Sequence, residues 1–250
     1  PNGTVRASGA DNYGQLGDNS TLSASNVPVT VFGLTKVTAV SAGGYHSLAL
    51  RSDGTVAAWG IDNVGQMGNG SASSANVPIP ATIAGLTDVV GIAAGYATNA
   101  AVKSDGTVWT WGYNGWGQIG DGTAGAGTDK LSPVRVPGLS GVVAVGGGYD
   151  SMLALKADGT VWAWGANASG QLGNGTITQS NVPVPVEVSA GVSLTGVKAI
   201  AANANAAFNV ALKADGTVWS WGNNAYGQLG DNSTTNRTRA VQAGITGVGA

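Results

Sequence analysis

The chain lacks cysteine altogether and is poor in charged residues, which disfavours several classes of function. Without cysteine there is no disulfide and no thiolate metal site, although this leaves the cellular compartment open. Asp, Glu, Lys and Arg make up only 10% of the 250 residues, and the formal net charge is -2. Because a nucleic-acid surface needs an excess of Lys and Arg to neutralise phosphates, we expect no nucleic-acid partner.

Long hydrophobic runs are also missing, and no stretch approaches the roughly 18 apolar residues of a membrane-spanning helix. The chain begins with Pro1 rather than Met, inside a repeated pattern, so we expect that a targeting segment or earlier repeats once preceded it. Sparse charge, absent cysteine and abundant Ser, Thr and Asn favour an exported bacterial protein. An extracellular or cell-surface location is therefore expected, with a cytoplasmic location as the alternative.

Glycine is abundant, with 42 residues, and it punctuates a repeat. A Gly/Trp/Gly signature, clearest in Gly159-Thr160-Val161-Trp162-Ala163-Trp164-Gly165, recurs at spacings of 51 to 57 residues. Its copies start at Gly3, Gly54, Gly106, Gly159 and Gly216. A period of that size is typical of a propeller or an array. A continuous repeat also favours one domain over two.

Each repeat divides into four short strands. In the copy that begins at Gly141, the expected strands cover residues 142–145, 151–156, 160–164 and 181–184. The strand at 160–164 is apolar on both faces, which is typical of sheets stacked face to face around an axis. A half-solvated sheet would instead alternate apolar and polar residues.

Two features place the strands within each repeat. An Asp-Gly pair, such as Asp158-Gly159, predicts a two-residue hairpin turn with positive φ between the second and third strands. Proline recurs in the fourth strand of four copies, as Pro28, Pro78, Pro133 and Pro183. Because proline cannot donate to a strand ladder, we expect this strand at the outer edge of each sheet.

These patterns predict an all-β protein, a β-propeller of four-stranded antiparallel blades, with four complete repeats and one half repeat. We expect a single domain over 1–250, with repeats at approximately 1–35 (the half blade), 36–85, 86–138, 139–188 and 189–250. Three arrangements stay open at this point. The chain is an open arc, a fragment of a larger ring, or part of an assembly in which another copy completes the terminal blade by self-association.

Three spaced motifs carry a family resemblance. They are Ala42-Gly43 followed by His46-Ser47-Leu48-Ala49-Leu50, then Asp53-Gly54-Thr55-Val56 with Trp59-Gly60, then Asn63 with Gly65-Gln66-Met67-Gly68-Asn69-Gly70. Together they resemble the repeat of the regulator of chromosome condensation family over essentially the whole chain. The resemblance implies a β-propeller, commonly of seven blades. Members include a guanine-nucleotide exchange factor and bacterial secreted proteins, so the fold alone does not select a function.

Two recurring residue types are expected to be structural. The tryptophans Trp59, Trp111, Trp164 and Trp221 occupy one repeat position, and packing between blades explains them better than an aromatic ligand site. Gln66, Gln118, Gln171 and Gln228 also share a position, and we expect each buried amide to tie its loop to the neighbouring blade.

We expect no catalytic residue, no cofactor and no metal site, and therefore no enzymatic activity. His46 is the only histidine, so a general base or metal ligand of that type would stand alone. Asp18, Asp121 and Asp231, with Asn69 and Asn174, follow the Gly-Gln motif. A side-chain bond to the local backbone is the favoured interpretation, and a calcium ligand is the alternative.

The positions at which the repeats differ are more informative, because a repeat scaffold keeps its core and varies its loops. One such set follows the first strand of each repeat and the other precedes the Gly-Gln motif. Tyr and Trp among small polar residues are typical of rigid binding surfaces. The residues expected to bind a partner are Tyr13, Tyr45, His46, Tyr96, Tyr113, Trp116, Tyr149 and Tyr226.

The function we predict is a non-enzymatic scaffold that binds another protein through these loop aromatics. Three alternatives remain: an exchange factor-like regulator of a small GTPase, a structural component of an extracellular fibre or surface, and a glycan-binding module.

Overall fold

The computed structural model describes residues 3–20, 22–245 and 247, and these form strands, turns and loops without a helix. Most strands belong to four sheets of four antiparallel strands, which we number blades 1 to 4 in chain order. Blade 1 contains β3 (Val37–Ala42), β4 (His46–Arg51), β5 (Val56–Asp62) and β6 (Ser73–Thr82); blade 2 contains β7 (Val89–Ala94), β8 (Thr98–Lys103), β9 (Val108–Gly112) and β10 (Lys130–Arg135). Blade 3 contains β11 (Val142–Gly147), β12 (Ser151–Lys156), β13 (Val161–Gly165) and β14 (Ser180–Pro185); blade 4 contains β17 (Val197–Ala202), β18 (Phe208–Lys213), β19 (Val218–Gly222) and β20 (Arg237–Gln242).

Two shorter sheets complete the described chain. A half blade of β1 (Arg6–Ala10) and β2 (Ala24–Thr30) precedes blade 1. A hairpin of β15 (Glu187–Ser189) and β16 (Val192–Ser193) lies between blades 3 and 4. This hairpin was not expected, and it accounts for the longer spacing between the last two copies of the repeat signature.

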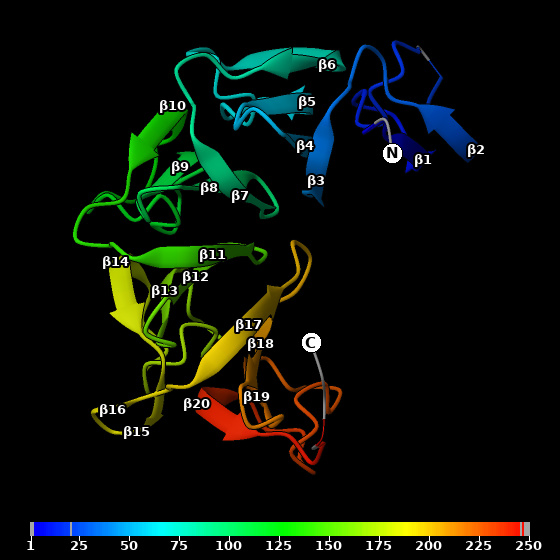
Figure 1. The fold of residues 1–250 in the computed structure, drawn as a ribbon. Coiled ribbons are helices and arrows are strands. Elements are labelled where there is room, and N and C mark those ends of the chain that lie inside the picture. Colours follow the sequence, from blue (N-terminus) through cyan, green and yellow to red (C-terminus); the bar gives the residue numbers. More distant parts are fainter. Residues whose placement is uncertain (1–2, 21, 246, 248–250) are drawn as a thin grey trace.

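The blades follow one another in an open arc around a common centre (Figure 1). The first strands of the blades, β3, β7, β11 and β17, lie nearest the centre and contact one another in sequence. Within each blade the strands pair in chain order, so the fourth strand lies at the sheet edge, and in blades 1 to 3 this strand contains the recurring proline. The prediction of an all-β propeller with four-stranded antiparallel blades is therefore confirmed. The expected outer limits of the domain, residues 1 and 250, lie outside the described residues.

The Asp-Gly hairpins differ in detail from the expected two-residue turn. In blade 1 the amide of Gly54 donates to the carbonyl oxygen of Arg51 at 3.0 Å, and the amide of Arg51 donates to that of Thr55 at 2.9 Å. The loop therefore has three residues, a turn followed by Gly54 at φ 77°. Only the glycine has positive φ, because a three-residue loop places just its last residue in the left-handed region.

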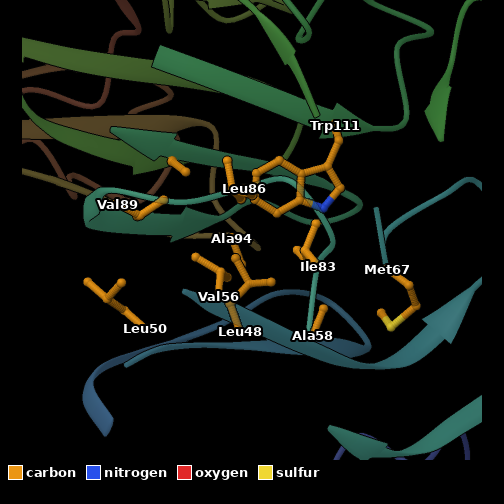
Figure 2. Close-up of a cluster of buried hydrophobic side chains, with 11 residues drawn as sticks. Leu48, Leu50, Val56, Ala58, Met67, Ile83, Leu86, Val89, Ala94 and Trp111 are labelled. Carbon is orange, nitrogen blue, oxygen red and sulfur yellow. The ribbon is translucent and has the colours of Figure 1, made fainter. Parts of the chain in front are cut away.

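Hydrophobic clusters fill the space between blades, and each contains one tryptophan of the recurring set. Trp111 lies in a cluster with Leu48 and Ile83, between blades 1 and 2 (Figure 2). Trp164 and Trp221 occupy the next two interfaces, and Trp59 the interface with the half blade. Each indole is at most 2% exposed. Burying an aromatic side chain of this size stabilises the contact between successive blades.

Each of these indoles also makes one hydrogen bond to the preceding blade. The Nε1 of Trp164 donates to the main-chain oxygen of Gln118 at 2.8 Å, and Trp59, Trp111 and Trp221 make the same bond to Gln15, Gln66 and Gln171. The Oε1 of the Gln118 side chain accepts from the amide of Trp116 in its own loop at 2.8 Å, and its Nε2 donates to Oδ1 of Asp150 in blade 3 at 3.2 Å. A side-chain bond to the neighbouring blade, as expected, is therefore present at Gln118, whereas the Nε2 atoms of Gln66 and Gln228 donate to Asn63 and Asn223 of their own loops. The main-chain oxygen makes the bond that is common to all interfaces.

Candidate functional site

The two variable loop sets lie on the same face of the arc. Consecutive strands of a blade run in opposite directions, so the turn between the first and second strands and the loop between the third and fourth emerge at the same end. The three-residue Asp-Gly loops emerge at the other end. Residues that are far apart in the sequence are brought together on the first of these faces.

A cavity of about 620 Å³ opens on this face across the half blade and blades 1 to 3. Its lining consists mainly of aromatic and small polar side chains. The lining residues are Tyr13, Tyr45, Ile61, Asn63, Val64, Gln66, Tyr96, Ala97, Tyr113, Trp116, Tyr149 and Asp150. Its size falls within the range of small-molecule and side-chain binding pockets.

Four tyrosines form a row of touching rings along the cavity. The ring centroids are 4.9 Å apart for Tyr13 and Tyr45, 5.8 Å for Tyr45 and Tyr96, and 4.6 Å for Tyr96 and Tyr149. The first two pairs meet edge to face, an arrangement that places the positive ring edge against the negative face. Each ring comes from a different blade or the half blade, so the row depends on the stacking of the blades.

Main-chain bonds between blades hold the turns that carry these rings. The amide of Gly44 donates to the carbonyl oxygen of Tyr96 at 3.0 Å, and the amide of Tyr96 donates to that of Gly148 at 3.2 Å. A Cβ on Gly44 would lie 2.7 Å from Cδ2 of the Tyr96 ring. Glycine is needed here because the ring of the next blade packs directly on the turn.

Trp116 and Tyr113 belong to the loop between β9 and β10. Trp116 is 48% exposed, and its amide is held by the side chain of Gln118. A Cβ on Gly115 would collide with the hydroxyl end of Tyr113, so the loop needs glycine there for that ring to lie across it. Burial raises the pKa of Tyr113, with further increases from the charges of Asp150 and Asp129.

Asp150 supplies the negative charge of the cavity. The Nε2 of Gln118 donates to its Oδ1 at 3.2 Å. Burial raises the pKa of Asp150 from 3.8 to about 6, since no cation offsets the loss of water. The pKa of Tyr96 is raised to about 12, chiefly by a hydrogen bond with Tyr45 and then by burial. The raised pKa values keep Tyr96 and Tyr113 neutral near neutral pH, while Asp150 changes charge just below it.

Six of the eight residues expected to bind a partner line the cavity together, namely Tyr13, Tyr45, Tyr96, Tyr113, Trp116 and Tyr149. Tyr226 is 94% exposed, but it lies in blade 4 outside the cavity. The expectation for His46 is wrong, because its side chain is only 1% exposed.

His46 is a core residue at the start of β4 and not a turn residue. Its pairing partner is Gly60, and the equivalent residues by register are Thr98, Ser151 and Phe208. Its Nε2 lies 2.6 Å from Oδ1 of Asn99 in blade 2. Burial lowers the pKa of His46 from 6.5 to about 4, so the ring is neutral near neutral pH.

The polar residues that follow the Gly-Gln motif bind their own loops, as in the favoured interpretation. The Oδ1 of Asp121 accepts from the amide of Thr123 at 2.9 Å, and Asp18, Asn69, Asn174 and Asp231 make the same bond two residues on. Within the described part of the chain, no three His, Cys, Asp or Glu side chains gather as a metal site would require.

Asp150 was missed as a site residue, although it belongs to one of the variable loop sets. The signal was present: it is the one acid in the turns between first and second strands, next to a tyrosine. Its repeat neighbours at that position are uncharged, which made the position read as ordinary turn variation.

The stacked four-stranded blades, with both variable loop sets on one face, define the class of the protein, a β-propeller repeat domain. The RCC1-like domain family matches residues 1–249, and the chain belongs to this family. The chain is 35% identical to the human E3 ubiquitin-protein ligase HERC2, over 96% of this chain and 5% of that protein. It is similar in fold to human WBSCR16, with a TM-score of 0.82 and 24% identity, over 98% of this chain and 63% of that one. Prp20p from Saccharomyces cerevisiae gives a TM-score of 0.80 and 22% identity, over 98% of this chain and 60% of that one.

The chain spans less than two thirds of each of these proteins. These relatives are eukaryotic, so they do not support the bacterial origin expected from composition, and the exported location stays a prediction. Among the residues that the structure describes, no helix has the length and hydropathy needed to cross a membrane.

Proposed function

We propose that this domain is a non-enzymatic scaffold that binds another protein through the aromatic cavity. The observation that carries the proposal is the cavity itself, in which six aromatic side chains from successive repeats line one hollow of about 620 Å³. Tyrosine and tryptophan are enriched at the centres of protein interfaces, where they combine large apolar area with a polar group.

The rigid placement of the aromatic rings supports a binding role rather than a catalytic one. Main-chain bonds fix the turns of Gly44 and Tyr96, and the rings contact one another in a row. A surface that is ordered before binding loses little conformational entropy when a partner arrives. The relatives agree with a protein partner: Prp20p has been studied for its binding to Gsp1p and histones, and a yeast complex contains Kap60 bound to RCC1 (Prp20).

The test is capture of proteins from an extract of the native host on three immobilised forms of the chain. These are the wild type, the double variant Trp116→Ala/Tyr149→Ala, and Tyr226→Ala as a matched control. Trp116 and Tyr149 are 48% and 45% exposed, so both can be truncated with little loss of packing. Tyr226 is an exposed aromatic on the same face outside the cavity.

We expect a protein that binds the wild type and the control alike and whose affinity falls at least about tenfold for the double variant, as for a central interface residue. Purified partner and a binding titration give the affinities, and circular dichroism verifies folding. Equal binding to all three forms would contradict the proposal. Retention of glycans in place of proteins on the same aromatics would replace it with the glycan-binding alternative.

A further inference from the structure

Among the described residues that line the aromatic cavity, Asp150 is the only one that carries a formal charge near neutral pH. It also lines a second cavity of about 270 Å³, shared with Trp116 and bounded by Ala166, Asn167 and Ile177, and no Lys, Arg or His lines that cavity. Among the described residues, no ion pair includes Asp150, and its one side-chain hydrogen bond comes from the neutral amide of Gln118 at 3.2 Å. A half-buried carboxylate is therefore left without a cation.

We propose that the cavity binds the guanidinium group of an arginine side chain, which stacks on the aromatic rings and donates to the Asp150 carboxylate. This inference rests on the proposed function, because the arginine is carried by the bound protein. It names the chemistry that the surface recognises, and it makes Asp150 a binding residue together with Trp116 and Tyr149.

The charge and the rings point to the same ligand. The faces of tyrosine and tryptophan carry negative quadrupole charge and attract cations, and the carboxylate does the same. An anion would find no positive side chain among the lining residues of either cavity. A purely apolar group would cover Asp150 and leave its charge buried without a partner, which opposes binding.

Arginine fits better than lysine for two reasons. The guanidinium group is planar, so it stacks on an aromatic face while its fork of N–H groups meets a carboxylate. It is also less strongly hydrated than an ammonium group, so less is lost when the cavity excludes water.

The ionisation of Asp150 adds a pH signature to this geometry. The titratable groups that line the cavity with Asp150 are tyrosines: Tyr149, its neighbour in the chain, Tyr113, whose pKa the charges of Asp150 and Asp129 both raise, and Tyr96. Burial holds the pKa of Asp150 at about 6 in the free protein. A bound cation lowers that pKa, so the affinity for the arginine side chain increases as the pH rises through 6 and decreases at pH values below 6.

The test uses short peptides in place of the unidentified partner. Acetyl-Gly-Arg-Gly-amide, its lysine counterpart and its citrulline counterpart, which has the same shape without the charge, are titrated into the folded chain. Chemical shifts of the Trp116 indole N–H in NMR spectra report binding, at pH 7.5 and at pH 5. Asp150→Asn removes the charge, and Asp158→Asn, in an exposed hairpin on the opposite face, is the matched control.

We expect the arginine peptide to shift the Trp116 signal and to bind about tenfold more tightly than the citrulline peptide, as charge-assisted bonds do relative to neutral ones. Asp150→Asn should remove that preference and the dependence on pH, while Asp158→Asn changes neither. Any of three results would overturn the inference: equal binding of the arginine and citrulline peptides, the same affinity of the arginine peptide for Asp150→Asn as for the wild type, or no shift of the Trp116 signal up to about 10 mM peptide.

Failure of this inference and failure of the proposed function are distinguishable. The peptides need no partner protein, whereas capture by the Trp116→Ala/Tyr149→Ala variant tests the aromatic cavity directly. If this double variant loses capture of the partner but the peptides show no preference for arginine, the arginine assignment alone is overturned. If the double variant captures the partner as well as the wild type does, the proposed function is overturned whatever the peptides do.

Discussion

At the scale of single residues, tryptophan has two distinct roles that depend on where the backbone places it. Trp164 is on a central strand, fully buried between blades, with its Nε1 bonded to the preceding blade. Trp116 is on a loop and 48% exposed. The first role stabilises the stack of blades and the second presents a ring to a partner, so the two should respond differently to truncation.

Trp164→Ala should lower the free energy of unfolding by about 3 to 5 kcal/mol, because it opens a cavity in the interface between blades 2 and 3. Trp116→Ala should change it by less than about 0.5 kcal/mol, as for an exposed position. Chemical denaturation followed by circular dichroism measures both. A loss for Trp116→Ala as large as that for Trp164→Ala would show that Trp116 is a packing residue and remove it from the site.

His46 predicts a dependence of stability on pH. Its pKa is about 4 when folded and about 6.5 when unfolded, so the unfolded chain binds a proton that the folded chain excludes. Stability from this group is complete above pH 6.5 and is lost as the pH falls to 4, by an amount of the order of 3 kcal/mol. The raised pKa of Asp150 acts in the opposite direction, because the folded state binds its proton more readily.

The comparison of wild type with His46→Thr isolates the histidine, because Thr98 occupies the same position in blade 2. Unfolding by urea at several pH values between 7 and 4.5 gives the slope of the free energy of unfolding against pH for each protein. The variant should lose less stability than the wild type over this range, whatever its stability at pH 7. Parallel slopes would mean that His46 is protonated or accessible in the folded chain.

At the scale of elements, the repeated hairpin depends on one glycine. In blade 3 this residue is Gly159, at φ 79°, and a Cβ there would lie 3.1 Å from the main-chain nitrogen of Gly196. The hairpin therefore meets the segment that leads into the next blade, and the amide of Val197 donates to the Gly159 oxygen at 3.1 Å. Turn geometry and contact between blades both require the absence of a side chain.

Gly159→Ala should destabilise the chain more than Gly138→Ala. Both residues have positive φ, which costs about 1 to 2 kcal/mol for alanine, but Gly138 has no atom within 4 Å of the added Cβ. The close contact at Gly159 should add about 1 kcal/mol. Thermal unfolding of the two variants measures the difference, and equal midpoints would show that the contact at Gly159 relaxes without cost.

Much of this element structure could be predicted because it is local. The repeat, the strand order and the proline edge strand follow from patterns within one copy. The predicted length of the Asp-Gly hairpin loop was wrong, because an Asp-Gly pair fits both a two-residue and a three-residue loop. The pairing register of the flanking strands decides between the two. His46 was misplaced for a related reason, since counting residues across the turn put it one position early. The cavity was not predictable as a cavity, because Tyr13 and Tyr149 meet its other rings only through the stacking of blades.

At the scale of the whole molecule, most contacts that the described sheets make with other sheets are with the adjacent sheets in the arc. Each interface contains its own hydrophobic cluster and its own tryptophan. In such a chain, stability is approximately a sum of the contributions of single repeats and of the contacts between neighbours. A change at one interface should therefore loosen the adjacent units and leave remote ones nearly as they were.

Amide hydrogen exchange of two matched variants tests this expectation. Trp59→Ala weakens the interface between the half blade and blade 1, and Trp221→Ala weakens that between blades 3 and 4; both indoles are almost fully buried and bonded to a glutamine main-chain oxygen. Trp59→Ala should accelerate exchange in β1 and β2, which have one neighbouring blade and mostly exposed residues, by at least about tenfold while β18 and β19 change little. Trp221→Ala should do the reverse. If either variant accelerates exchange equally from β1 to β20, the blades unfold as one cooperative unit and the aromatic row is stabilised by the whole arc rather than by its own interfaces.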